Sequence, residues 1–211
     1  MMKRKLLILT WLLFLFSSNV SARILTGSSF FDHFTIGAEW GYTQCLLQSR
    51  NYNFISEEGY RIYENNTAFR AHANAQVLGH IGYRLSEQTS LALYSGYIGM
   101  GKDNRLLPLM LRLSFFPSTD NEDGLFVYGQ GGVAWHVHAT AGRMAWLASL
   151  GGGYRFRLAW NTNLDLLFGI KYLHDHPSIP NPEGPGNVPE HNIRMNNAGY
   201  CALDVSIAIS F

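Results

Sequence analysis

Apolar and polar residues alternate with a period of two through most of this sequence, and this pattern constrains the fold more than any other feature. From Leu203 to the terminal Phe211, every second residue is apolar and the residues between them are polar or small. Such alternation is typical of β-strands with two different faces. Most of the strands are long enough to cross a bilayer, which takes about 9–11 tilted residues. Eight segments of this kind occur, at about residues 33–43, 69–84, 89–99, 107–115, 127–138, 146–157, 163–172 and 203–211.

The composition excludes several other classes of protein. Of the 211 residues, 47% are apolar and only 15% are charged, whereas a soluble globular chain usually carries about 25% charged residues. The mean hydropathy of -0.04 nevertheless excludes a helical protein with many membrane spans. The formal net charge of +1 is too small for a nucleic-acid-binding surface, so we expect no nucleic-acid partner.

The first 22 residues have the pattern of a secretory signal peptide. Three basic residues at 3–5 precede an apolar stretch from Leu6 to Phe16, and Val20 and Ala22 occupy the small-residue positions before a cleavage site. The apolar stretch is too short for a spanning helix, which needs about 20 residues. We therefore expect residues 1–22 to be a signal peptide and 23–211 to be the exported domain.

The connections between the eight segments alternate in length. Short turns are expected near 86–88, 117–123 and 160–162, whereas the connections at about 46–67 and 175–195 are long. Short turns at one end and longer loops at the other are the plan of a transmembrane barrel. We therefore predict an all-β fold, an eight-stranded antiparallel up-and-down transmembrane β-barrel, with these two long connections as external loops.

The polar face of the segments carries charged residues among Gly, Ser and Asn. An eight-stranded barrel has little internal space, which small residues and paired charges would fill, and buried charges need partners. We therefore expect the apolar face to contact lipid and the charges to pair in the lumen. We also expect the lumen to be too narrow for a wide pore. A secreted sandwich or lipocalin-like barrel, with the faces reversed, is the alternative. The charges expected in the lumen are Glu39, Arg70, Arg84, Arg112, Arg155 and Asp165.

With its signal peptide, eight amphipathic strands and terminal Phe211, the chain resembles the small outer-membrane β-barrels, such as outer membrane protein X and the OmpA barrel domain. The ending Leu203-x-Val205-x-Ile207-x-Ile209-x-Phe211 resembles the C-terminal strand that the barrel-assembly machinery reads, although many members have Tyr where this chain has Ile209. The resemblance implies a monomer in the outer membrane of a Gram-negative bacterium. Its partners would be the barrel-assembly machinery, outer-membrane lipid and lipopolysaccharide, and Phe211 would be the assembly signal.

Cys45 and Cys201 are the only cysteines, and export permits a disulfide between them. The first and last strands of a closed barrel are neighbours, which brings the two residues to the same level. Their parity opposes the bond, because Cys45 falls on the inward set and Cys201 on the lipid-facing set. A β-bulge in either strand would correct the parity. The sequence leaves a disulfide and two free thiols both open.

Histidines suggest two kinds of chemistry near the external end. His136, His138, His174 and His176 have spacings that can chelate a transition metal, but rim histidines also serve as polar-tipped side chains, and we expect no cofactor. The segment from His174 resembles the motif of the PagL-type lipid A deacylases, with Ser178 as a candidate nucleophile and Glu183 as a candidate orienting acid. The position two after His174, where that family has Ser, is His176 here.

Three functions remain open from the sequence. A structural or surface-interaction scaffold that presents 46–67 and 175–195 is the first expectation. A lipid A deacylase that uses His174 is the second, and a narrow channel for small solutes is the third.

Overall fold

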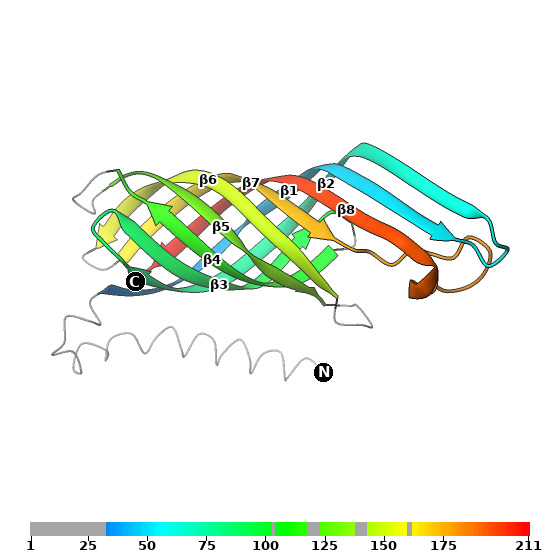
Figure 1. The fold of residues 1–211 in the computed structure, drawn as a ribbon. Coiled ribbons are helices and arrows are strands. Elements are labelled where there is room, and N and C mark those ends of the chain that lie inside the picture. Colours follow the sequence, from blue (N-terminus) through cyan, green and yellow to red (C-terminus); the bar gives the residue numbers. More distant parts are fainter. Residues whose placement is uncertain (1–32, 103, 118–122, 138–142, 160–161) are drawn as a thin grey trace, which may run out of the picture. The chain divides into compact units, whose positions relative to one another are not determined.

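A computed structural model describes residues 33–102, 104–117, 123–137, 143–159 and 162–211. It shows eight strands in one closed barrel, each paired with its neighbours in chain order (Figure 1). The predicted fold class is confirmed, and the predicted signal peptide lies outside the described residues. The elements are β1 (Phe34–Ile55), β2 (Arg61–Arg84), β3 (Thr89–Met100), β4 (Asn104–Phe115), β5 (Gly124–His136), β6 (Met144–Ala159), β7 (Thr162–Asp175), the short 3-10 helix η4 (Glu190–Asn192) and β8 (Ile193–Ser210).

The sheet closes between β1 and β8. Their antiparallel register runs from Gly37↔Ser210 to Phe54↔Ile193. The last residue takes part in this closure, because Phe211 donates a backbone hydrogen bond to Ile36 O at 2.9 Å and accepts one from Ile36 N at 3.1 Å. The role of Phe211 as an assembly signal stays a prediction. No helix in the described ranges is long and apolar enough to cross a membrane.

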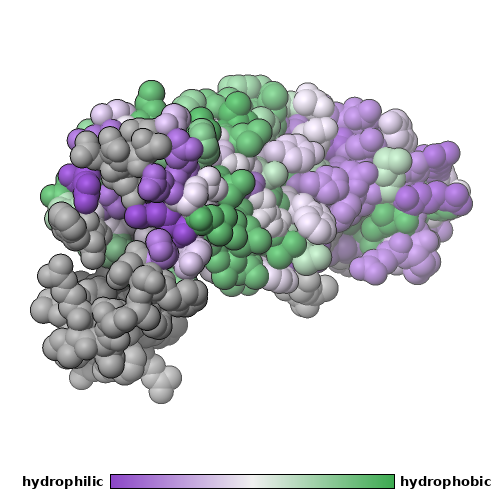
Figure 2. All heavy atoms as spheres, turned by 60° about the vertical axis from the view of Figure 1, so that its left-hand side comes forward, coloured by the Kyte–Doolittle hydropathy of each residue, from purple (hydrophilic) through white to green (hydrophobic). Residues whose placement is uncertain are grey.

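The apolar residues of the alternating pattern point outward. Along β4, Leu111 is 54% exposed whereas its neighbours Met110 and Arg112 are 1% and 3% exposed. The same alternation on the other strands produces an apolar band between two polar ends (Figure 2). From Leu107 to Phe115 this band covers about 26 Å of strand, or about 20 Å of barrel height at a tilt of about 40°. That height is close to the apolar band of outer-membrane barrels, about 25 Å.

The lumen is filled by side chains in layers. Paired charges lie near the end with the short turns, together with a small apolar cluster that includes Phe116 and Phe126, and again in the middle of the lumen. A larger apolar cluster fills the part of the lumen toward the other end. This apolar layer differs from the expectation that only small residues and charges would fill the interior. The difference arises because an inward residue of an eight-stranded barrel contacts other side chains and no water, so apolar side chains pack there too. The large members of the layer are Leu78, Ile98, Met100, Leu106, Met110, Leu147, Leu173 and Tyr200.

Three strands continue past the others at the end of the barrel opposite the short turns, where β1, β2 and β8 extend beyond the rest of the barrel (Figure 1). The register of β2 with β3 begins only at Gln76↔Ile98, so most of the first half of β2 lies beyond β3. In this extension both faces of β2 are largely exposed from Arg61 to Ala71, which suits a segment outside lipid.

The prediction of a loop at 46–67 is therefore wrong in its detail. Most of this segment is β-strand, and the connection between β1 and β2 is only the turn 56–60. Gly59 adopts a φ of +90°, a conformation that glycine accepts without strain. The turn is closed by Ser56 N donating to Tyr60 O at 2.9 Å and by Glu58 N donating to Ser56 Oγ at 3.1 Å. Sequence alternation missed these strands because burial does not alternate along them: β2 is largely exposed on both faces from Arg61 to Ala71, and the adjacent β1 residues Asn53 and Phe54 are both buried.

The predicted loop at 175–195 is present, as the connection 176–192 between β7 and β8, which includes η4. A small hydrophobic cluster joins this connection to the extension: Phe54 from β1 packs with Ile179 and Val188 from the loop. A β-bridge between Pro180 and Asn187 closes the loop on itself. We call the extension and this loop together the outer platform.

Candidate functional site

The middle of the lumen holds a buried ion pair. Arg112 Nη1 lies 2.7 Å from Glu39 Oε2, and the two side chains are 3% and 1% exposed. The guanidinium also donates to Gln130 Oε1 at 2.7 Å and to the Tyr94 hydroxyl at 3.0 Å. Its Cζ lies 4.0 Å from the centroid of the Tyr94 ring, a cation–π contact. Each charge thus has a partner of opposite sign and further hydrogen bonds, as buried charges require.

A second buried pair lies beside the first. Lys171 Nζ, fully buried, donates to Asp204 Oδ1 at 3.0 Å. Gln76 joins the two pairs, because its amide donates at 3.2 Å both to Glu39 and to Asp204 and its carbonyl oxygen accepts from Lys171. The network is electrically neutral, with two cations and two anions. Lys171 and Asp204 lie on the neighbouring strands β7 and β8, where Lys171 is in register with Ala202. The lumen charges predicted from the sequence did not include this pair.

The remaining predicted lumen charges divide into two groups. Arg155 and Asp165 form a two-bond pair at 2.7 Å near the short turns, and Arg155 also lies over the Phe116 ring at 4.3 Å. Arg84 is half-buried at the same end. Arg70 is a correction: it is exposed on the part of β2 beyond β3, outside the lumen. Its parity is inward, but the barrel has ended at that level.

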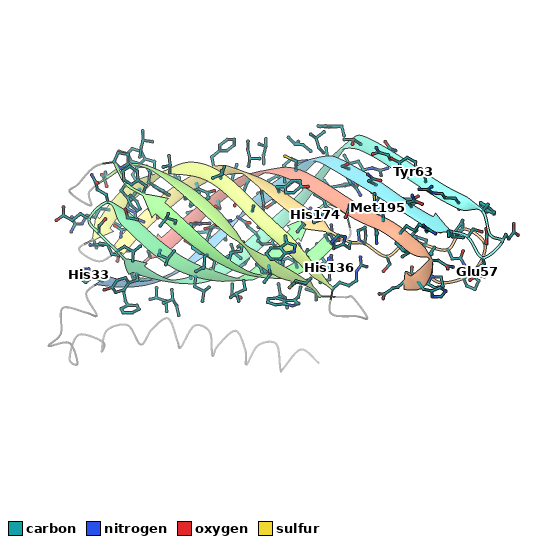
Figure 3. The ribbon with its side chains drawn as sticks, in the orientation of Figure 1. His33, Glu57, Tyr63, His136, His174 and Met195 are labelled. Carbon is teal, nitrogen blue, oxygen red and sulfur yellow. The ribbon has the colours of Figure 1, made fainter. Side chains whose placement is uncertain are left out.

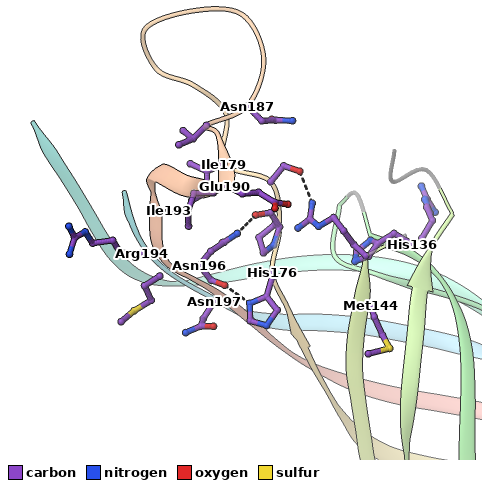
Figure 4. Close-up of a pocket in the computed structure, with 16 residues that line it drawn as sticks. His136, Met144, His176, Ile179, Asn187, Glu190, Ile193, Arg194, Asn196 and Asn197 are labelled. Atoms are coloured by element: carbon purple, nitrogen blue, oxygen red, sulfur yellow. Dashed lines mark hydrogen bonds between the residues drawn. The ribbon is translucent and has the colours of Figure 1, made fainter. Parts of the chain in front are cut away.

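A large cleft lies at the end of the barrel opposite the short turns, between the β7–β8 loop, the start of β8 and the nearby ends of β4, β5 and β6 (Figure 4). Its volume is about 940 Å³. Arg143 Nη1 crosses it to donate to Ser178 Oγ at 2.6 Å. On the loop side, Asn196 Nδ2 donates to Pro177 O at 2.5 Å, and His176 contacts Asn196 O through Nδ1. These bonds hold the loop against the residue that precedes β6 and against β8.

Three of the four histidine candidates for a metal site, His136, His174 and His176, lie in the described part of the chain, and they do not form a metal site there. His136 Nε2 lies 3.0 Å from Asp175 Oδ1, a pair on the inward side of the rim. The rings of His174 and His176 meet edge to face with centroids 4.9 Å apart, whereas His138 lies outside the described residues. Figure 3 labels His136 at the end of β5 and His174 near the end of β7, and β6 lies between these two strands. In the described part of the chain, no group of three or more His, Cys, Asp or Glu could hold a metal ion.

The residues considered for a deacylase have other partners. The Ser178 hydroxyl already accepts the arginine hydrogen bond described above, and Glu183 accepts one from the Ser56 hydroxyl. The contact of His174 is with the ring of His176. No hydrogen bond among the described residues joins His174 to Ser178 or Glu183, so the structure contains no assembled Ser–His–acid arrangement.

Glu183 instead links the two parts of the outer platform. Hydrogen bonds from the Ser56 and Tyr60 hydroxyls hold the pKa of Glu183 below its ordinary value. The acceptor carboxylate comes from the tip of the β7–β8 loop, and both donors come from the β1–β2 turn. This contact was missed from the sequence because 127 residues separate Ser56 from Glu183.

Both cysteines are free in this structure, so the disulfide considered for them is not formed. The anticipated bulge does occur in β1, where Cys45 pairs with Ala202 and Leu47 with Cys201. It follows Cys45 rather than preceding it, so Cys45 stays on the inward side, 1% exposed, while Cys201 is half-buried among the outward residues. The two thiols therefore lie on opposite faces of the sheet.

Fold and lumen together define a class. A closed barrel with apolar residues outside and paired charges inside has the polarity of a transmembrane β-barrel, the reverse of a soluble one. The chain is thus an eight-stranded transmembrane β-barrel.

Known proteins resemble the chain in fold. No protein-family model matches it, and a search of the curated proteins finds no match. Similar solved structures include Neisserial surface protein A, at 13% identity and a TM-score of 0.44, covering 84% of this chain and 97% of that chain. Another is the outer membrane protein OprG from Pseudomonas aeruginosa, at 12% identity and a TM-score of 0.46, covering 85% and 96%. A third is the N-terminal β-barrel domain of OprF from the same organism, at 13% identity and a TM-score of 0.37, covering 83% and 97%.

Proposed function

We propose that this chain is a non-conducting scaffold in the outer membrane of a Gram-negative bacterium, which holds the outer platform at the cell surface for interaction with an external partner. The observation that carries the proposal is the filled lumen combined with a platform that is fixed in place. If nothing passes through the barrel, its function depends on its exposed surface.

The layers of the lumen support the closed state. An ion passing through would have to separate the neutral network of Glu39, Arg112, Lys171 and Asp204 and then cross the apolar layer above it. Breaking a buried ion pair by removing one partner costs about 3–5 kcal/mol, and the apolar layer offers few hydrogen bonds to a hydrated ion. A narrow solute channel is therefore less well supported than a scaffold.

The contacts of the platform support a surface role. The Phe54 cluster, the Glu183 link and the Arg143–Ser178 bond hold the β7–β8 loop at three points. A loop fixed in this way binds a partner without a large ordering cost, because little conformational entropy is left to lose. The absence of an assembled triad among the described residues removes the geometric support for a deacylase.

Three measurements test the scaffold. The refolded protein in lipid vesicles is expected to migrate faster on a gel when unboiled than when boiled, and to produce no steps of current in a planar bilayer. Steps of uniform conductance would replace the scaffold by a channel. Lipid A mass spectra from cells with and without the protein are expected to be identical, and a lost acyl chain would restore the enzyme.

A truncation separates the platform from the barrel. Thr67 Oγ1 donates to Ser49 Oγ at 3.2 Å across the hairpin, so residues 50–66 can be replaced by an Asn-Gly turn, which suits a two-residue hairpin. The truncated protein is expected to keep its unboiled fast-migrating form and to lose binding of whole cells to surfaces or host material that the intact protein supports. Full retention of that binding would contradict a role for the hairpin.

A further inference from the structure

The large external cleft is basic. Of the described residues that line it, Arg105, Arg143 and Arg194 are cationic and Glu190 is the one carboxylate. The nearby Asp175 does not line the cleft and pairs with His136. A cleft with three guanidinium groups against one carboxylate favours an anion.

The arginines keep donors available for such an anion. Arg105 uses Nη1 for the Tyr97 hydroxyl at 3.1 Å, and Arg143 uses Nη1 for Ser178. A guanidinium carries five N–H donors in a fork that matches phosphate oxygens. Arg143 Nη2 is buried and has no hydrogen-bond partner among the described residues.

The cleft lies at the level where lipid headgroups meet water. Arg105 belongs to the outward set of β4, one alternation above Leu107, the first residue of the apolar band. Met144, which lines the cleft, is 46% exposed on the outward face of β6, and Trp146 below it is 59% exposed. An anion held by Arg105 would therefore lie directly above the lipid-facing surface.

Apolar side chains from β6, the β7–β8 loop and β8 also line the cleft, among polar ones. This combination of cationic and apolar lining suits a molecule that has both an anionic group and acyl chains. The apolar lining residues are Met144, Ile179, Val188, Ile193 and Met195.

We propose that this cleft binds the phosphorylated headgroup of a lipid of the outer leaflet, with the phosphate on Arg105, Arg143 and Arg194 and the acyl chains along the outward face below Met144. The inference rests on the proposed placement of this end of the barrel at the outer surface. It names the first partner of the outer platform as the membrane's own lipid.

Native mass spectrometry of the protein in a zwitterionic detergent tests the site, with diphosphorylated lipid A as the probe. The wild type is expected to retain one lipid. The double variant Arg105→Gln/Arg194→Gln is expected to bind about tenfold more weakly or worse, because charge-assisted bonds to phosphate are lost. The matched control Arg61→Gln/Arg70→Gln removes the same charge from the same end of the protein outside this cleft, and is expected to bind like the wild type.

Three results would overturn the proposal. Equal binding by the Arg105/Arg194 double variant would remove these residues from the site. Equal weakening in the control pair would reduce the attraction to general charge. The third result is equal affinity for one part of the lipid. Equal affinity for pyrophosphate would show that the cleft binds a free phosphate, and equal affinity for the same lipid after removal of its phosphates would show that it binds acyl chains alone. Failure of the proposed scaffold function would give a different result, either current through the barrel or loss of the fast-migrating gel band. Both are measured on the same samples.

Discussion

The buried pair of Arg112 and Glu39 predicts a large coupling energy. In Arg112→Met, the Glu39 carboxylate stays 1% exposed without its cation and keeps only Ser206 and Gln76 as donors. Removing one partner of a buried pair costs about 3–5 kcal/mol. Glu39→Met leaves Arg112 as an isolated buried cation, and we expect a similar loss of about 3–5 kcal/mol.

The double variant is expected to be more stable than the sum of its parts. With both charges gone, the remaining cost is that of donors and acceptors left without partners on Gln130, Ser206 and Gln76, about 2–3 kcal/mol in all. The two single losses add to about 6–10 kcal/mol, so the coupling energy is at least about 3 kcal/mol.

Urea titration of the protein in lipid vesicles measures this coupling, with the folded fraction read from unboiled gel bands. The conservative Glu39→Gln controls for side-chain shape, since it removes the charge and keeps the volume. Strictly additive single and double variants, or an Arg112→Met variant as stable as the wild type, would refute the argument that the lumen charges form one network.

Three other outcomes follow from the packing, the platform and the cysteines. Gly151→Ala is expected to cost about 1–3 kcal/mol, because the new Cβ would lie 2.6 Å from the Tyr128 hydroxyl, whereas Gly131→Ala meets only Leu147 O at 3.8 Å and is expected to be neutral in the same urea titration. The lowered pKa of Glu183 means that its link to Ser56 is fully present above the ordinary value of about 4.3 and is lost as the pH falls through the lowered pKa; the protection factors of amide hydrogen exchange in 178–188, which are corrected for the intrinsic effect of pH, are expected to fall at low pH in the wild type and to be insensitive to pH in Glu183→Gln. Both cysteines are expected to react with a maleimide after unfolding without reductant, and a band that requires reduction would show that they are bonded.

The sequence predicted the barrel because lipid imposes a simple rule on it. Exposed and buried residues alternate strictly from Leu107 to Phe115, because each outward side chain must be compatible with lipid and each inward side chain must pack in the lumen. No such rule acts beyond the bilayer, so the strand residues at 46–55 and 61–67 were predicted as part of a loop.

The partners of the charged residues could be predicted only in part. Parity placed Glu39, Arg112, Arg155 and Asp165 on one face, but which charges meet depends on the stagger of eight strands around a closed sheet. Arg70 shows the limit of parity, because it is inward by count and lies above the point where the lumen ends. The basic cleft was not foreseen, since its arginines come from β4, the start of β6 and β8.

The central claim is that the alternating apolar face contacts lipid and the charged face fills the lumen. Spin labels placed one at a time from Leu106 to Leu113, in a background with Cys45→Ala and Cys201→Ala, test it directly in lipid vesicles. The odd-numbered positions are expected to be accessible to oxygen, which is enriched in lipid, and the even-numbered positions to be immobile and inaccessible. Odd-numbered positions that respond instead to a water-soluble relaxing agent would show a soluble barrel and contradict the account.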